Sequence, residues 1–372
     1  MNTKNASLTD FPDADIKNLV LSMGEPEFRV KQLRSWIYRG LAFSFGEMTN
    51  LPLAFRQALE KAVQLHCLKA AHQVVGQDGT VKTLFTLADG NTIESAMMTY
   101  AQAGGMQRNT VCVSTQAGCA IGCPFCATGQ QGFRRNLTRG EIIDQVLYFA
   151  HYLKNQENTG KTKTGASGLA NIVFMGMGEP LANYEALWQA IETLNSPDGF
   201  GMGARNMTIS TSGMAPQIKR LGREKLQVGL AVSLHAADNA LRNWLVPINK
   251  KYPLEVLLPA CKEYYLGTGR RVSFEYVLFK GLNDSIGQAR ALARLLQGLN
   301  CHVNLIPANL TANRSFQPPS PQVVVAFEKE LGRLHINATL RQPRGQDIDA
   351  GCGQLRSRLM KDTGRKKVSA KA

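Results

Sequence analysis

Residues 111–129, VCVSTQAGCAIGCPFCATG, join a short β-branched run to a loop that carries three cysteines. Five more β-rich runs follow: NIVFMG (171–176), MTISTSG (207–213), VGLAVSLH (228–235), VSFEYVLF (272–279) and CHVNLIP (301–307). Segments with helical spacing of apolar residues lie between them, as in 141–153, 184–194, 286–299 and 322–334. Six such repeats predict an α/β fold with a parallel sheet and crossover helices. This number favours a partial (β/α)6 TIM-like barrel over the closed eight-fold barrel, with a doubly wound open sheet as the alternative.

The chain before these repeats has two other patterns. Apolar residues at spacings of three and four predict helices in 13–24, 28–41 and 51–66. Between His72 and Tyr100, Asp78-Gly79 and Asp89-Gly90 separate alternating runs, as hairpin turns do. We therefore expect a small N-terminal helical domain over 1–66, a β-hairpin extension of two or three antiparallel strands over 67–104, the barrel over 105–355, and a flexible basic tail over 356–372.

The composition limits the class of protein. Of 372 residues 44% are hydrophobic, and 43 Lys and Arg against 28 Asp and Glu give a net charge of +15. This charge favours polyanionic partners such as nucleic acid, although a basic protein without such a partner has the same composition. The first residues lack the apolar segment of a signal peptide, and no run of about 18 apolar residues occurs. We expect a cytoplasmic protein without a membrane segment, whose eight cysteines serve metal or redox chemistry rather than a disulfide scaffold.

The three cysteines of the loop, Cys119, Cys123 and Cys126, form a C-x3-C-x2-C pattern. The loop follows the carboxyl end of the first predicted strand, where barrels build their sites, and leads to Thr138 and Glu141, a capping box that starts the next helix. A structural zinc site and an ordinary ferredoxin cluster each need four protein ligands. Three thiolates leave one iron of a [4Fe-4S] cluster for an outside ligand, and the amino and carboxylate groups of S-adenosylmethionine suit that position. Buried thiols or zinc ligands are the alternative.

Longer motifs surround these cysteines. They are CVSTQAGCAIGCPFCATGQQGFRRNLTRGEI, FMGMGEPLANY, STSGMAPQI, VSLHAADNALRNWLVPINKKYP, VNLIPAN and DIDAGCGQL. Together they resemble the RlmN and Cfr family of radical S-adenosylmethionine RNA adenosine methyltransferases, from about Phe28 to Leu355. Pro180 in MGMGEP and the run VPINKKYP resemble the RlmN type, which methylates carbon 2 of adenosine, more than the Cfr type, which methylates carbon 8.

The resemblance implies a [4Fe-4S] cluster on the three cysteines and S-adenosylmethionine as a second cofactor, used twice per turnover. It places the amino end of S-adenosylmethionine at Gly178 and Glu179, where glycine lets the backbone approach a ligand and a carboxylate accepts from an ammonium group. The other implied cofactor contacts follow later strands: Ser210, Ser233, Leu234, His235 and Asn309. A capping serine or a core histidine is the ordinary alternative for single positions, but consecutive strand ends meet at one rim of a barrel.

The resemblance also implies a thiol relay. Carbon 2 of adenine does not attack a methylsulfonium, whereas a thiolate does. Cys352, in a glycine-flanked loop, would accept a methyl group, whose carbon would then add to adenine as a radical. Glu94 would remove the proton from the ring carbon, and Cys112 would attack the Cys352 sulfur and leave a disulfide. Its strand position alone would make Cys112 a small buried hydrophobe. Three further cysteines are assigned to packing: Cys67, Cys261 and Cys301.

The same family implies the partners. We expect 23S ribosomal RNA, transfer RNA as for some members, and an electron donor such as flavodoxin or ferredoxin, with the protein itself a monomer. The helical domain mixes cations with aromatic residues, as contacts to single-stranded RNA do: Arg29, Lys31, Arg34, Trp36 and Tyr38. Trp36 fits a core position equally well. The alternatives are a Cfr-like enzyme that modifies ribosomes and gives antibiotic resistance, and a non-catalytic RNA-binding protein with a structural metal.

Overall fold

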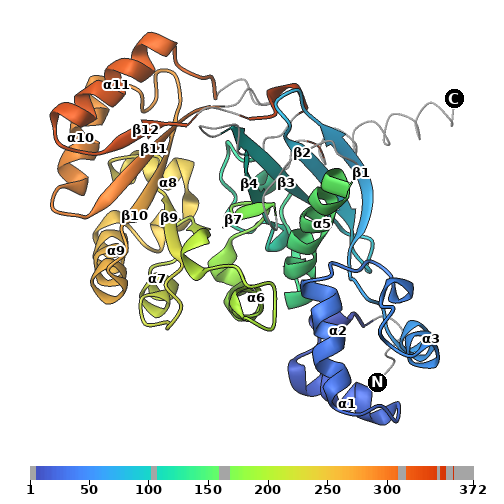
Figure 1. Ribbon diagram of the computed structural model, residues 1–372. Helices are drawn as coiled ribbons and strands as arrows, with labels where there is room; N and C mark the ends of the chain where they lie inside the picture. The colour runs from blue at the N-terminus through green and yellow to red at the C-terminus, as the bar shows by residue number, and fades with distance from the viewer. Residues whose placement is uncertain are drawn as a thin grey trace, which may run out of the picture.

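The computed structural model describes residues 6–101, 107–158, 168–308, 316–341 and 344–348, together with Leu355. Within them, the parallel strands are β4 (Gln107–Cys112), β7 (Leu169–Phe174), β8 (Met207–Thr211), β9 (Gly229–Ser233), β10 (Val272–Leu278), β11 (Cys301–Pro307) and β12 (Ala338–Leu340). Their order in the sheet follows their order in the chain (Figure 1). A doubly wound sheet would reverse its strand order at a switch point, so this topology is that of a partial barrel. The short strand β12 was not predicted.

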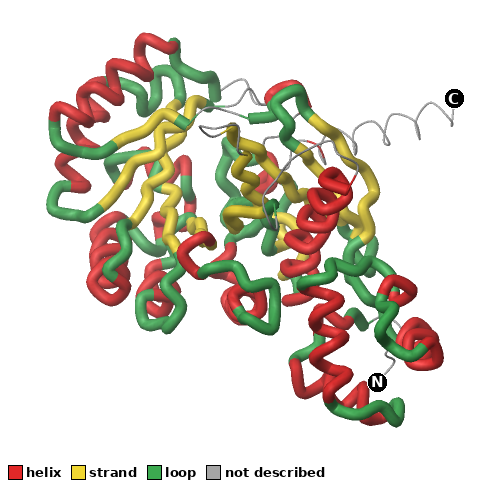
Figure 2. The backbone as a smooth tube through the Cα atoms, viewed as in Figure 1, coloured by secondary structure: helices red, strands yellow, loops and turns green. Residues whose placement is uncertain are grey.

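Helices cover the outer face of this parallel sheet (Figure 2). They are α5 (Arg139–Asn158), α6 (Tyr184–Asn195), α7 (Ala215–Leu221), α9 (Leu254–Thr268), α10 (Ile286–Leu296) and α11 (Pro321–Arg333). The short helix α8 (Asn239–Leu245) lies instead at the carboxyl ends of the strands, where Leu245 packs beside Ala236 and Phe279. Alternate strand residues such as Val111, Ile172 and Ile209 are fully buried against the helices. In each strand, the residues one position before and after these therefore point to the opposite, inner face of the sheet. The predicted capping box of α5 is present, because Thr138 N–H donates to Glu141 Oε2 at 2.9 Å and Glu141 N–H donates to Thr138 Oγ1 at 3.2 Å.

The antiparallel extension continues the barrel sheet. It consists of β1 (Lys69–Val75), β2 (Val81–Thr86) and β3 (Thr92–Ala101). The predicted Asp-Gly turns join these strands, with Gly79 and Gly90 at φ of +77° and +82°. Because β3 pairs with β4 along Ala96–Ala101, the extension and the barrel share one sheet of ten strands within the described residues. A second, two-stranded sheet joins β5 (Gln116–Gly118) to β6 (Phe133–Asn136), with the short helix α4 (Ala127–Gln130) between them.

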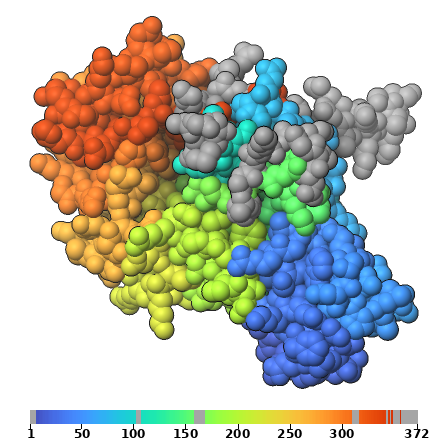
Figure 3. All heavy atoms as spheres, viewed as in Figure 1, coloured from blue at the N-terminus to red at the C-terminus, as the bar shows by residue number. Residues whose placement is uncertain are grey.

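The three predicted N-terminal helices are present as α1 (Asp13–Ser22), α2 (Phe28–Tyr38) and α3 (Leu53–Ala62). They form a lobe beside α5, blue at one corner of the molecule in Figure 3. Single turns of 3-10 helix complete the described elements: η2 (Leu8–Asp10), η3 (Phe45–Glu47), η5 (Pro180–Asn183), η6 (Ala204–Asn206), η7 (Pro247–Lys250) and η8 (Gln346–Ile348). None of the helices in these ranges combines the length and the apolar character that crossing a membrane requires.

The structure separates the residues that were predicted to contact RNA. Tyr38 is fully buried, and the buried Arg34 forms an ion pair with Asp13. Trp36 is half-buried, packs against the core and donates from its indole N–H to Asn50 Oδ1 at 2.5 Å. The prediction of a surface contact was wrong for Arg34 and Tyr38, because α2 turns these side chains toward the interior. Lys31 is exposed and Arg29 half-buried.

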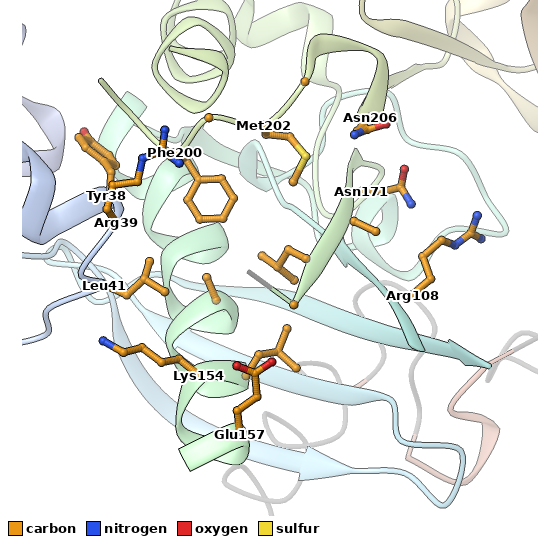
Figure 4. Close-up of a pocket in the computed structure, with 17 residues that line it drawn as sticks. Tyr38, Arg39, Leu41, Arg108, Lys154, Glu157, Asn171, Phe200, Met202 and Asn206 are labelled. Carbon is orange, nitrogen blue, oxygen red and sulfur yellow. The ribbon is translucent and has the colours of Figure 1, made fainter. Parts of the chain in front are cut away.

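A pocket of about 700 Å³ lies where the helical domain, α5 and the amino ends of β4 and β7 meet (Figure 4). Arg39, Arg108 and Lys154 contribute positive charge to its lining. Arg39 donates to Pro197 O at 2.9 Å and Lys154 donates to Gly40 O at 2.6 Å, so both bind backbone of a neighbouring segment. The pocket therefore belongs to the domain junction, at the opposite end of the strands from the cysteine loop.

A buried histidine also holds this junction. His66 Nδ1 lies 2.8 Å from Asp144 Oδ1 in α5, and its Nε2 lies 2.9 Å from Ala42 O. Only the protonated ring can donate to both acceptors. Burial lowers the pKa of His66, but the charge of Asp144 and the hydrogen bonds to Asp144 and Ala42 outweigh it and raise the pKa above the usual value.

A raised pKa makes this contact pH-dependent. Its contribution to the free energy of unfolding is complete below about pH 6.5, the ordinary pKa of histidine, and is lost as the pH rises through the raised pKa of His66. We expect the melting temperature to fall over this range, and His66→Gln to remove that part of the fall. Thermal melts at a series of pH values would measure it. His72→Gln, at an exposed site in β1, is the control and should keep the wild-type profile. An unchanged profile in His66→Gln would refute this role.

Candidate active site

The cysteine loop is a compact turn at the carboxyl end of β4. Cys119, Cys123 and Cys126 are half-buried, unpaired thiols, and Cys126 N–H donates to Cys123 O at 3.1 Å. Gly118 has φ of +83°, and a Cβ atom there would lie 1.9 Å from Gly132 O. A side chain at this position would therefore break the turn that returns the chain to β6.

The loop is seated on the ends of three later strands. Cys123 and Phe125 pack against a hydrophobic cluster that contains Ala236, Phe279 and Ala308, which follow β9, β10 and β11. The Phe125 ring lies 5.2 Å from the His235 ring in an edge-to-face arrangement. The cysteine loop thus lies at the rim where the barrel strands end, the position that the sequence predicted for it.

The donor set fits an iron-sulfur cluster. Burial raises the pKa of Cys119 to about 12, and binding to iron would release its proton. In the described ranges, no three His, Cys, Asp or Glu side chains surround one point as ligands of a single metal ion do. A cluster needs no such arrangement, because each thiolate binds a different iron atom.

Gly178 and Glu179 lie in the loop after β7, beside the cysteine loop. Gly178 has φ of +105°, and a Cβ atom there would lie 2.5 Å from Gln116 Cβ. Glu179 N–H donates to Gln116 Oε1 at 2.8 Å. The buried Glu179 carboxylate accepts from Ser212 N–H and Ser212 O–H, both at 2.7 Å, which ties the loop after β7 to the loop after β8. Burial outweighs these hydrogen bonds and raises the pKa of Glu179.

The predicted residues on β8 and β9 lie at neighbouring strand ends. Ser210 and Ser233 are half-buried on the inner face, and Ser233 is opposite Glu275 of β10. Leu234 is fully buried and its N–H donates to Glu275 O at 3.0 Å. His235 Nδ1 accepts from Val277 N–H at 3.1 Å. Burial, with a smaller effect of the Arg242 charge, lowers the pKa of His235 to about 3, so the ring is neutral and its proton is on Nε2.

Two predicted residues, Asn309 and Cys352, lie outside the described residues, as does the tail over 356–372. Ala308, which precedes Asn309, packs in the hydrophobic cluster under Phe125.

Cys112 and Glu94 share the inner face of the sheet. Ala96 pairs with both Cys112 and Lys82, and Glu94 is two residues from Ala96 on the same face. Lys82 Nζ lies 2.7 Å from Glu94 Oε2, and both side chains are almost fully buried. Burial raises the pKa of Cys112 to about 11, although Arg341, Met175 N–H and Lys82 partly oppose this.

The sequence reasoning missed Lys82, Ser212 and Arg242. Lys82 offered one signal, since it is the single charged residue of the strand VKTLFT. Ser212 lay inside a quoted motif, but its role depends on Glu179, 33 positions earlier. No local pattern indicated that Arg242 is fully buried.

Comparison with known proteins assigns the class. Residues 113–293 match the radical SAM superfamily, and residues 6–65 match the ribosomal RNA large subunit methyltransferase N-terminal domain. A crystal structure of a radical SAM methyltransferase from Sphaerobacter thermophilus is 47% identical, with a TM-score of 0.87 over 94% of this chain and 98% of that chain. The protein is thus a radical SAM methyltransferase with an α/β fold, and this class implies an iron-sulfur cluster and S-adenosylmethionine.

Two relatives narrow the assignment. The "Probable dual-specificity RNA methyltransferase RlmN" of Desulfitobacterium hafniense is 45% identical over 96% of this chain and 99% of its own length. The "Dual-specificity RNA methyltransferase RlmN" of Syntrophobacter fumaroxidans is 43% identical over 93% of this chain and 96% of its own length. The chain belongs to the RlmN family. The resemblance predicted from the motifs is confirmed, and the protein is an enzyme rather than a non-catalytic RNA-binding protein.

The buried Lys82–Glu94 pair can be tested directly. Replacing Lys82 by Met leaves the Glu94 carboxylate without this cation, and breaking a buried ion pair from one side costs roughly 3–5 kcal/mol. We expect Lys82→Met to lower the free energy of unfolding by about this amount in urea denaturation. The double variant Lys82→Met, Glu94→Gln removes both charges and should recover part of the loss. Equal stability of wild type and Lys82→Met would contradict the pairing.

Proposed function

We propose that the protein methylates carbon 2 of an adenosine in 23S ribosomal RNA and also acts on transfer RNA, the second substrate that the resemblance to the RlmN type implies. The observation that carries this proposal is the full-length likeness to RlmN proteins together with a three-cysteine loop at the barrel rim. A cytoplasmic monomer that receives electrons from a flavodoxin or ferredoxin fits this function.

Cys119, Cys123 and Cys126 would hold a [4Fe-4S] cluster, and the strand-end residues from Gly178 to Asn309 would orient S-adenosylmethionine beside it. When bound, these groups supply an electron, a methyl group and, from a second S-adenosylmethionine, a 5′-deoxyadenosyl radical. Glu179 and Ser212 tie the loop after β7 to the loop after β8, because the buried Glu179 carboxylate accepts two hydrogen bonds of 2.7 Å from Ser212. Neutral His235 offers its Nε2–H as a donor at the same rim.

The protein's own residues would carry the relay. Cys352 takes the methyl group on sulfur and loses one hydrogen atom of this group to the 5′-deoxyadenosyl radical, and the resulting carbon radical then bonds to carbon 2 of the adenine. Glu94 accepts the proton that leaves that carbon, with Lys82 beside it to stabilise the carboxylate before transfer. The adduct gives up one electron, for which the oxidised cluster would be the acceptor. The Cys112 thiolate then bonds to the Cys352 sulfur, the sulfur–carbon bond breaks, and the carbon takes up a proton to become the methyl group of the base. An external thiol must reduce the resulting disulfide. Cys112 and Glu94 share the inner face of the sheet, as this sequence of steps requires.

Replacing Cys352 by Ala tests the relay. The variant should assemble its cluster with wild-type absorbance and should still cleave S-adenosylmethionine in the presence of dithionite. Methyl transfer to RNA should fall below detection, because no thiol accepts the first methyl group. Cys301→Ala, at a buried packing position in β11, is the matched control and should keep activity. Methylation by Cys352→Ala at the wild-type rate would refute the relay.

Mass spectrometry of nucleosides would identify the methylated carbon. Ribosomal RNA from a host that carries the gene should contain 2-methyladenosine, and RNA from a host without it should lack this nucleoside. The same comparison on transfer RNA tests the second substrate. If 8-methyladenosine alone depended on the gene, the protein would be Cfr-like and the proposed position would be wrong.

A further inference from the structure

Arg242 of α8 is one of the largest fully buried side chains in the structure. Its Nε donates to Leu234 O at 3.1 Å, and its Nη2 donates to Ser212 O at 2.8 Å and to Ser233 O at 3.1 Å. Its Nη1 donates to Asn249 Oδ1 at 2.6 Å. The guanidinium therefore joins the loops after β8 and β9 to the turn that follows α8.

All four acceptors are neutral. Across the described ranges no carboxylate forms an ion pair with Arg242, in contrast to the partly exposed Arg135, which pairs with both Asp89 and Glu141. Burying a guanidinium without an anion is costly, and such charges in proteins are usually paired or bind ions. Burial lowers the pKa of Arg242 to about 10, so the group stays charged at neutral pH. The four hydrogen bonds use four of its five N–H donors, and no carboxylate in the described ranges compensates its charge.

The cysteine loop lies next to this charge. Cys123 packs against the hydrophobic cluster that contains Leu245 and Val246, at the end of α8, and Leu241 packs there too. A thiolate at Cys123 would favour the charged guanidinium, as would one at the buried Cys261. The metal centre that Cys123 and its two neighbours would hold therefore lies on the side of α8 that carries this charge.

We propose that Arg242 is the buried counter-charge of the iron-sulfur cluster and raises its reduction potential. This inference rests on the proposed function, which places the cluster on the three cysteines. Three thiolates make a bound cluster anionic, and accepting one electron from the donor adds one negative charge. A fixed cation stabilises the reduced form more than the oxidised form, and burial prevents water and salt from screening it.

Two neutralising variants of the full-length protein test the proposal. Arg242→Gln removes the charge, and Asn249→Asp keeps the guanidinium but places a carboxylate where Oδ1 now accepts from it. After anaerobic reconstitution, the cluster is titrated against redox mediators and followed by EPR. We expect the ratio of reduced to oxidised cluster at a fixed potential to fall about tenfold in each variant, a shift of about 59 mV for one electron. Coulomb's law with an effective dielectric constant of about 20 gives this size for a unit charge roughly 12 Å away.

Two further variants separate charge from structure. Arg242→Lys keeps the positive charge but loses the hydrogen bonds that depend on the shape of the guanidinium. The reduction potential of the cluster in this variant should therefore stay near that of wild type. Arg223→Gln removes an exposed charge that pairs with Glu263 and should not change the potential. Circular dichroism and cluster absorbance show which variants fold and load iron, and if Arg242→Gln fails to fold, Asn249→Asp and Arg242→Lys decide.

The outcomes are distinct. A wild-type potential in a folded, iron-loaded Arg242→Gln or Asn249→Asp protein would overturn the proposal and leave the methyltransferase function intact. A fall in Arg242→Lys as large as in the neutral variants would also overturn it, because geometry and not charge would then set the potential. Failure of the wild-type protein to build any cluster would instead refute the proposed function.

Discussion

The rim of the barrel depends on one constraint: a parallel sheet ends in loops whose backbone groups have no neighbouring strand to bond. Side chains satisfy them here. Gln145 pairs with both backbone groups of Ser114, accepting from its N–H at 2.7 Å and donating to its carbonyl at 2.9 Å. Asn283 donates to the carbonyls of His235 and Val277. Since buried polar groups are costly when unpaired, these bonds fix the loops before any ligand arrives.

Local patterns in the sequence predicted much of the fold. The three N-terminal helices, the Asp-Gly turns and the capping box of α5 each depend on residues within a few positions of one another, and all are present. The strand β12 was missed because its three residues are too few for a periodic signal. For the candidate site, local motifs predicted the cysteine loop and the residues at the strand ends. It could not identify pairs such as Ser212 with Glu179, whose meaning arises only when two strands become neighbours.

The structure changes the interpretation of the basic composition, because some of the arginines form contacts within the protein. The guanidinium carbon Cζ of Arg34 lies 5.6 Å from the centre of the Tyr38 ring. Arg34 Nε donates to Asp198 O at 3.3 Å, so this side chain joins the helical domain to the segment after α6. Arg139 donates to Phe11 O across the same junction. Several arginines that contribute to the net charge thus form contacts between domains. The net charge alone therefore overstates the number of cationic side chains that can bind RNA.

The continuity of β3 with β4 has a consequence for how such an enzyme can arise. A closed barrel has no free edge, so new reactive groups must come from its loops. An open barrel can instead be extended by strands that pair with its edge strand. The backbone hydrogen bonds of each added strand then fix the positions of its side chains. Glu94 and Lys82 reach the inner face of the sheet in this way, on the strands one and two places outside the parallel part. The open edge of the barrel therefore lets the antiparallel extension add a buried pair of charged side chains to the inner face of the sheet.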